Sequence, residues 1–220
     1  MARDAFQTGV HSLDRALGGG IPPGSVAVAL GDARSAVELV GYRTAVTTTC
    51  DTRYLTTMRT PATVRAALDD AANAGRRVDT LDLAHPETVE IRAVDGTEQT
   101  DERRLSFDQH GVIVVDSFRD LVASGDWREP FDAIREHVRD REGLALLVLD
   151  VHPEASLSRP LRQLCRAADA VLEYHTDRAT EDALTARKMR GLAADEPVLP
   201  VTVPLEVGRT VHHDPDRGHQ

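Results

Sequence analysis

Apolar and polar residues follow one another along this chain in blocks that predict strands and helices in alternation. Short apolar runs, several of them rich in valine, predict buried strands at residues 25–30, 52–58, 88–94, 111–117, 144–151, 170–175, 183–190 and 198–207. Apolar residues spaced three or four apart predict helices within residues 9–24, 35–46, 61–75, 127–143 and 157–168. We interpret the polar stretch before residue 110 as a loop or a frayed helix. Alternating strands and helices predict an α/β fold with a mostly parallel central sheet and helices on both faces.

The length of 220 residues has room for one compact domain. We expect a single domain over residues 1–208 and a disordered tail over 209–220. His212, His213 and His219 lie in that tail. Because a disordered tail gives a metal no fixed ligand geometry, we interpret these histidines as a chance cluster rather than a metal site.

Charge and composition narrow the classes of partner. The net charge is −10, which disfavours a broad nucleic-acid-binding face, although a local basic patch remains compatible with it. Of the 26 basic residues only Lys188 is a lysine, and this composition is typical of a salt-adapted, halophilic archaeal-like protein or of a GC-rich source.

No apolar run has the length of a membrane span, and the N-terminus lacks the apolar core of a signal peptide. We therefore expect a cytoplasmic protein without membrane contact. Cys50 and Cys165 belong to no metal-binding or redox motif, so we expect buried, reduced thiols without a chemical role.

Ligands in parallel sheets bind beyond the carboxyl ends of the strands. Residues 31–38 follow the first predicted strand, Met58 and Arg59 close the second, and Asp116 and Ser117 end the strand before residue 118. These segments are the candidate site.

The segment that follows the first strand has the spacing of a phosphate-binding loop without its chemistry. Such a loop reads GxxxxGK[ST], in which backbone N–H groups and the lysine hold phosphate and the hydroxyl holds Mg²⁺. Aligned on its first glycine, this chain has Ala36, Val37 and Glu38 at the glycine, lysine and hydroxyl positions. The full segment comprises Gly31, Asp32, Ala33, Arg34, Ser35, Ala36, Val37 and Glu38.

Each change opposes phosphate binding. If the second glycine position requires a positive φ, Ala36 is strained there by about 1–2 kcal/mol. Val37 supplies no charge, and Glu38 repels a triphosphate even though its carboxylate could hold Mg²⁺. Arg34 is a possible substitute cation, but it stands three residues before the lysine position. The alternative interpretation is an ordinary strand-to-helix turn with Val37 in the core.

Four segments resemble those of the KaiC-like branch of the RecA superfamily. "TGVHSLDRALGGGIPPGSVAVALGD" (8–32) resembles the segment that precedes the family's phosphate loop, and Asp116-Ser117 resembles the end of its Walker B strand. "CRAADAVLEY" (165–174) and "KMRG" (188–191) resemble two later family elements, in the family's order. The resemblance implies a RecA-like, P-loop-type core whose ATPase members assemble into rings or filaments with ATP between neighbours.

The chain departs from that family at the positions of catalysis. The family's ATPases carry a catalytic glutamate just after the second strand, where this chain has Met58 and Arg59. Asp116 is then either the Mg²⁺-side carboxylate of a residual site or a strand-end residue that orders the next loop, and we favour the second. In the family, the K-x-R pair reaches a neighbour's γ-phosphate, so Lys188 and Arg190 are either trans-acting contacts or a solvated surface pair.

We therefore hypothesise a non-catalytic pseudo-ATPase that acts through protein partners in regulation or signalling. Its partner would be a P-loop-bearing paralogue or a second copy of itself, and no cofactor is expected unless the degenerate loop still binds ATP and Mg²⁺. One alternative is an ATPase with an unorthodox site, or a subunit that completes a neighbour's ATP site through Lys188 and Arg190. A second alternative is a recombination-type DNA accessory protein, which the acidic charge disfavours.

Overall fold

A computed structural model describes residues 5–31, 36–76, 86–94, 107, 109–119, 122, 126–151, 157–176, 182–191 and 199–204. Its strands are β1 (Ser25–Gly31), β2 (Thr52–Thr56), β3 (Val89–Ala93), β4 (Val112–Asp116), β5 (Leu144–Asp150), β6 (Ala170–His175), β7 (Ala183–Met189) and β8 (Val201–Pro204). Its helices are α1 (His11–Ala16), α2 (Glu38–Thr47), α3 (Pro61–Arg76), α5 (Arg128–Asp140) and α6 (Arg159–Ala167), with a 3₁₀ turn η1 at Pro86–Thr88. Each predicted strand and helix has a counterpart among these elements.

The strands form one sheet in the order β3-β2-β4-β5-β1-β6-β7-β8. Strands β1 to β6 pair in parallel, whereas β7 and β8 are antiparallel and extend one edge. The sheet is therefore mostly parallel, as the alternation of elements predicts. Strands β2, β4, β5 and β1 are consecutive and parallel in this sheet, so their carboxyl ends lie side by side at one edge.

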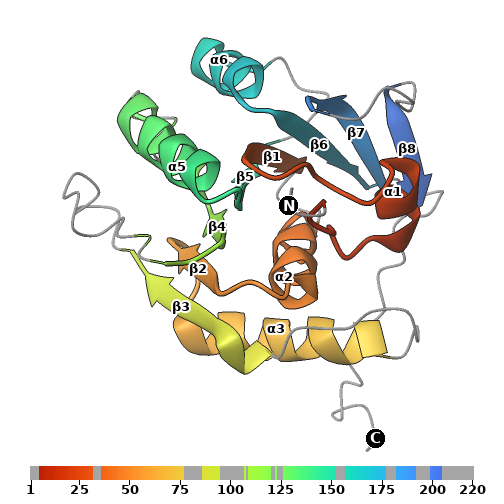
Figure 1. Ribbon diagram of the computed structural model, residues 1–220, viewed down its shortest axis with the longest axis vertical. Helices are drawn as coiled ribbons and strands as arrows, with labels where there is room; N and C mark the ends of the chain where they lie inside the picture. Colours follow the sequence, from red (N-terminus) through yellow and green to blue (C-terminus); the bar gives the residue numbers. More distant parts are fainter. Residues whose placement is uncertain are drawn as a thin grey trace, which may run out of the picture.

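Helices cover both faces of the sheet, with α2 and α3 on one side and α5 and α6 on the other (Figure 1). Strand β1 shows why the sheet needs both layers, because all seven of its residues are buried. Ala27 and Ala29 point into the core on the α2 side, whereas Val26, Val28 and Leu30 point into the core on the α5 side. A continuous apolar run is the pattern expected of such a central strand.

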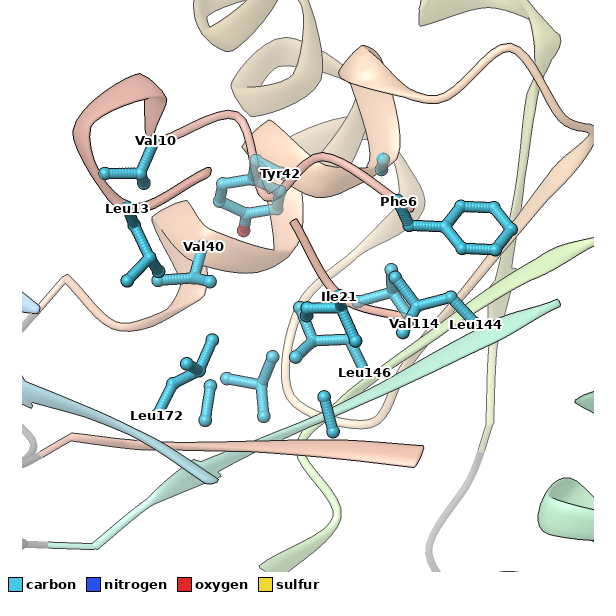
Figure 2. Packing of buried hydrophobic residues seen from close by; sticks show 14 of the residues in the cluster. Phe6, Val10, Leu13, Ile21, Val40, Tyr42, Val114, Leu144, Leu146 and Leu172 are labelled. Carbon is cyan, nitrogen blue, oxygen red and sulfur yellow. The ribbon is translucent and has the colours of Figure 1, made fainter. Parts of the chain in front are cut away.

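The N-terminal segment completes the core on the α2 side. Val10, Leu13 and Leu17 are buried, in agreement with the predicted apolar face of α1. Figure 2 shows Leu13, Val40 and Ile21 among the side chains that gather between this segment, α2 and the sheet. The hydroxyls of Thr44 and Thr47 on α2 donate hydrogen bonds to backbone carbonyls of residues 8 and 7. This segment is thus fixed against the helix that begins at the candidate site.

The expectation of buried cysteines changes, and the expectations for the C-terminal segment stay predictions. Cys50 and Cys165 are free thiols but only half-buried, because each lies at the border of its core rather than inside it. The domain boundary at residue 208, the tail and its histidines lie outside the described residues. Within the described part of the chain, every helix is too short or too polar to cross a membrane.

Candidate functional site

The turn from β1 to α2 is described at its two ends. Gly31 closes β1, and Ala36 and Val37 precede α2, whereas residues 32–35 lie outside the described residues. The proposal that Arg34 is a substitute cation therefore stays a prediction. Ala36 has no positive φ, since Glu142 is the one described non-glycine residue in that region. The strain considered for an alanine at this position does not arise.

Val37 fills the lysine position with a core side chain. Only 3% of its surface is exposed, and it packs in the core on the α2 side. The interpretation of Val37 as a core residue is thus confirmed. Glu38 follows as the first residue of α2. The partial positive charge of a helix N-terminus stabilises a carboxylate there, which accounts for Glu38 without any ligand.

Arg59 joins the segments that follow β1, β2 and β4. One guanidinium nitrogen, Nη2, lies 3.0 Å from Oε1 of Glu38, and the other, Nη1, bonds Oδ2 of Asp116. Asp116 is almost fully buried, whereas Arg59 keeps 30% of its side-chain surface exposed. We call Glu38, Arg59 and Asp116 the Arg59 cluster. Its one cation stands between two carboxylates that would otherwise repel each other.

The turn after β2 fixes the backbone of Arg59. Its N–H donates to Oγ1 of Thr56 over 3.0 Å, and that hydroxyl donates to the Arg59 carbonyl over 3.2 Å. Thr56 lies opposite Asp116 in the parallel register of β2 and β4. Strand pairing and a local turn therefore bring the guanidinium to the buried carboxylate.

Two stacked tyrosines lie beneath the cluster. The Tyr54 hydroxyl donates to Oδ2 of Asp116 over 3.1 Å, and the ring of Tyr42 stacks on that of Tyr54 with centroids 5.5 Å apart. Gly41 leaves room for this arrangement, since a Cβ there would lie 3.2 Å from Cγ1 of Val114 and 3.5 Å from the Tyr54 hydroxyl. The small residue lets α2 approach the sheet closely.

The surroundings keep the protons of these groups in place. Burial, and then the charge of Asp116, raises the pKa of Tyr54 well above its usual value, so the phenol stays protonated as a donor. Burial also raises the pKa of Tyr42. Burial by itself would lower the pKa of Arg59, but Asp116, Tyr42 and Glu38 outweigh it and raise the pKa. The guanidinium is therefore permanently charged.

The loop after β4 is ordered by Ser117 rather than by the Asp116 side chain. Ser117 N–H donates to Oγ1 of Thr57, whose hydroxyl donates back to the Ser117 carbonyl. Ser117 Oγ accepts from the N–H of Arg119. The carboxylate of Asp116 meanwhile contacts Arg59 and Tyr54. Met58, the other residue at the end of the predicted second strand, is exposed to solvent over 70% of its surface.

Lys188 and Arg190 lie together at the C-terminal end of α6. Lys188 Nζ donates to the carbonyls of Cys165, Arg166 and Ala168. Arg190 donates to the Arg166 carbonyl and keeps 58% of its side-chain surface exposed. Lys188 is therefore not a solvated surface residue, because α6 occupies its three N–H donors. A contact of either residue with a neighbouring subunit stays a prediction.

Sequence reasoning placed Arg59 and Asp116 at the same edge but missed their contact, and it missed Tyr42 and Tyr54 altogether. The signal for Arg59 was an arginine directly after a buried strand, where a long side chain can turn back over the edge. Nothing in the sequence marks the tyrosines as more than core aromatics, since their role depends on which strands are neighbours.

The chain belongs to the family described as "Family of unknown function (DUF7125)", whose pattern it matches over residues 5–218. No curated protein sequence matches it. Many solved structures are similar in fold, and two of them serve as examples. The RadB recombinase superposes with a TM-score of 0.62 at 16% identity, covering 90% of this chain and 94% of that one. The flagellar accessory protein FlaH from Methanocaldococcus jannaschii superposes with a TM-score of 0.57 at 18% identity, covering 81% and 84%. The fold is therefore α/β and RecA-like.

Proposed function

We propose that this member of the DUF7125 family is a non-catalytic RecA-like protein of the KaiC-like branch, a pseudo-ATPase that acts through protein partners in regulation or signalling. The observation that carries the proposal is the Arg59 cluster. Its guanidinium occupies the space between Glu38 and Asp116, at the sheet edge where parallel α/β folds bind ligands.

The residues at this edge do not fit a magnesium nucleotide. Carboxylates are ligands that Mg²⁺ prefers, and Glu38 and Asp116 supply two of them. Both are already paired with Arg59, so a metal ion would have to displace a cation that the fold holds by two charge-assisted contacts. Val37 offers phosphate no ammonium group because it is buried in the core.

The position after β2 also lacks a general base. Arg59 has five N–H donors and no acceptor, and it stays charged, so it cannot take a proton from water. Met58 has no titratable group. A nucleotide that did bind here would therefore meet no side chain at these two positions able to activate water.

Protein partners fit this interpretation better than the alternatives. Lys188, which would complete a neighbour's ATP site, gives its donors to α6 within its own chain. A P-loop-bearing paralogue, self-association and a cytoplasmic location stay predictions of the proposal. DNA binding is disfavoured by the net charge of −10.

Titration calorimetry with Mg-ATP, paired with a phosphate-release assay, tests the proposal. We expect neither measurable heat nor turnover, because Arg59 already pairs with both carboxylates and the turn has no lysine. Micromolar binding followed by turnover that Asp116→Ala abolishes would contradict it. Asp150→Ala is the matched control, because this carboxylate ends β5 at the same edge but is exposed and forms only a long ion pair, 3.9 Å from Arg119.

A further inference from the structure

The outer face of α6 carries a row of arginines. Arg159, Arg162 and Arg166 are exposed and recur at positions i, i+3 and i+7, which places them within about 60° of arc on one side of the helix. The opposite side carries Leu164, which is fully buried in the core that α6 shares with α5. We call these three residues the α6 arginine face.

The stability of the helix does not explain the first two arginines. A helix N-terminus carries partial positive charge, so acidic residues stabilise the first turn and cations destabilise it. The first turn of α6 has no acidic residue, and Arg159 is its first helical position. Arg162 donates to the Leu157 carbonyl, a contact that leaves its charge uncompensated. Residues that break a local rule without a structural gain point to a function.

Neighbouring residues strengthen the positive charge. Lys188 and Arg190 lie at the C-terminal end of the same helix. The acidic groups described beside them are already engaged and largely buried, since Asp169 lies 3.8 Å from Arg190 and Glu173 lies 2.6 Å from Arg187. Within the described residues, this surface is thus a local positive patch on a chain whose net charge is −10.

We propose that the α6 arginine face docks an acidic segment of a partner protein. Guanidinium groups bind carboxylates through paired, charge-assisted hydrogen bonds, and carboxylates spaced one helical turn apart would match the spacing of this face. Charge complementarity at such a patch also steers the encounter of the two proteins. The proposal does not use the Arg59 cluster, so it stands or falls independently of nucleotide binding.

Two observations favour a protein segment over a nucleic acid. The chain has four phenylalanines, three tyrosines and one tryptophan, and all of them are buried, so none is available to stack on a base. In addition, a nucleic acid extends beyond the patch, where the remaining surface carries the excess negative charge and repels phosphate. A short acidic protein segment would contact only the positive patch and would avoid this repulsion.

Fluorescence anisotropy with a synthetic helical peptide tests the proposal. The probe peptide carries glutamates at i, i+3 and i+7. A control peptide of otherwise identical sequence carries glutamines at these three positions. At about 50 mM salt, where screening is weak, we expect wild type to bind the glutamate peptide at least about tenfold more tightly than the glutamine peptide. The triple variant Arg159→Gln, Arg162→Gln, Arg166→Gln should lose this preference, and Arg159→Lys, Arg162→Lys, Arg166→Lys should retain part of it.

The matched control removes the same charge elsewhere. Arg15→Gln, Arg92→Gln and Arg135→Gln together change the charge by an equal amount on α1, β3 and α5, and this variant should bind the glutamate peptide within about twofold of wild type. Circular dichroism confirms that each variant is folded.

Equal binding of the glutamate peptide by wild type and the glutamine triple variant would overturn the proposal. Tighter binding of a single-stranded DNA 20-mer than of the peptide would overturn it in favour of nucleic acid. Self-association of wild type that the triple variant abolishes would support it and identify a second copy of this chain as the partner. The Mg-ATP assays read out the proposed function separately.

Discussion

Arg59 acts at the sheet edge as a built-in cation. Asp116 is almost completely buried, and a buried carboxylate without a counter-charge costs several kcal/mol. Arg59 supplies that charge and also pairs with Glu38, while Tyr54 adds a hydrogen bond to Asp116. The glutamate at the hydroxyl position of the phosphate loop and the arginine after β2 are therefore not independent changes, because Glu38 and Arg59 pair with each other.

Removal of Arg59 should destabilise the protein. We expect Arg59→Ala to lower the free energy of unfolding by about 3 kcal/mol, because Asp116 would remain buried without its partner. Urea denaturation measures the change. Arg119→Ala, which removes an equal charge at the same edge, should stay within about 0.5 kcal/mol of wild type. Equal effects of the two substitutions would show that the cluster contributes nothing specific.

Asp14 should make stability depend on pH. Burial raises its pKa from 3.8 to about 6, against opposing hydrogen bonds from Thr8 and Gly9. Because the folded state holds this proton more tightly than the unfolded state, the contribution is full below pH 3.8 and is lost as the pH rises through 6. The expected loss is about 3 kcal/mol.

The variant Asp14→Asn isolates this effect. We expect its free energy of unfolding, measured relative to wild type, to rise between pH 4 and pH 7, because only wild type must ionise a buried carboxyl there. Urea denaturation at a series of pH values gives the difference directly. Parallel pH profiles for the two proteins would contradict the assignment to Asp14.

At the scale of elements, Lys188 is the cap of α6. Its ammonium group donates to three carbonyls at the end of that helix, which are groups that a helix cannot satisfy by itself. We expect Lys188→Met to lower the free energy of unfolding by about 1–2 kcal/mol through the loss of these charge-assisted bonds.

Arg187→Met is the comparison for that substitution. Arg187 precedes Lys188 on β7 and forms an ion pair with Glu173 of β6, in which the arginine side chain is half exposed; solvent screens such a pair, so it contributes little. If Lys188 acted only on a neighbouring subunit, its removal would leave the stability of the isolated chain unchanged, as measured by urea denaturation. That outcome would favour the trans-acting role that the family resemblance implies.

Most elements could be predicted from the sequence because each has a clear local signal. The apolar run over residues 25–30 indicated a central strand. A proline at the start and a glycine near the end of residues 61–75 indicated the helix that the structure shows as α3, Pro61–Arg76. Sequence patterns define a boundary poorly where polar residues enter a strand. The strand predicted over residues 52–58 ends as β2 at Thr56, because Thr56 binds back to Arg59 and closes a turn.

At the scale of the whole molecule, the order of strands decides the site. Arg59 and Asp116 lie 57 residues apart, and they meet because β2 pairs with β4. Periodicity shows that a strand is buried but not which strand lies beside it. The sequence therefore predicted the positions that form the edge, whereas the ion pairs, the tyrosines and the capping role of Lys188 required the folded arrangement.

The comparison with solved structures also separates the fold from the residues of the candidate site. The fold resembles those of the RadB recombinase and FlaH at only 16% and 18% identity. A buried sheet tolerates many combinations of apolar residues, so such a scaffold persists while the residues at its edge change. Fold similarity alone therefore carries no activity to this chain, and the chemistry must be argued from Glu38, Arg59 and Asp116.

A crystal structure determined with Mg²⁺ and a non-hydrolysable ATP analogue tests the central claim most directly. We predict that Arg59 stays between Glu38 and Asp116, with no phosphate density beside residues 31–38. Clear triphosphate density there, with Mg²⁺ between the two carboxylates and Arg59 displaced, would contradict the claim that this chain carries its own cation in place of a nucleotide.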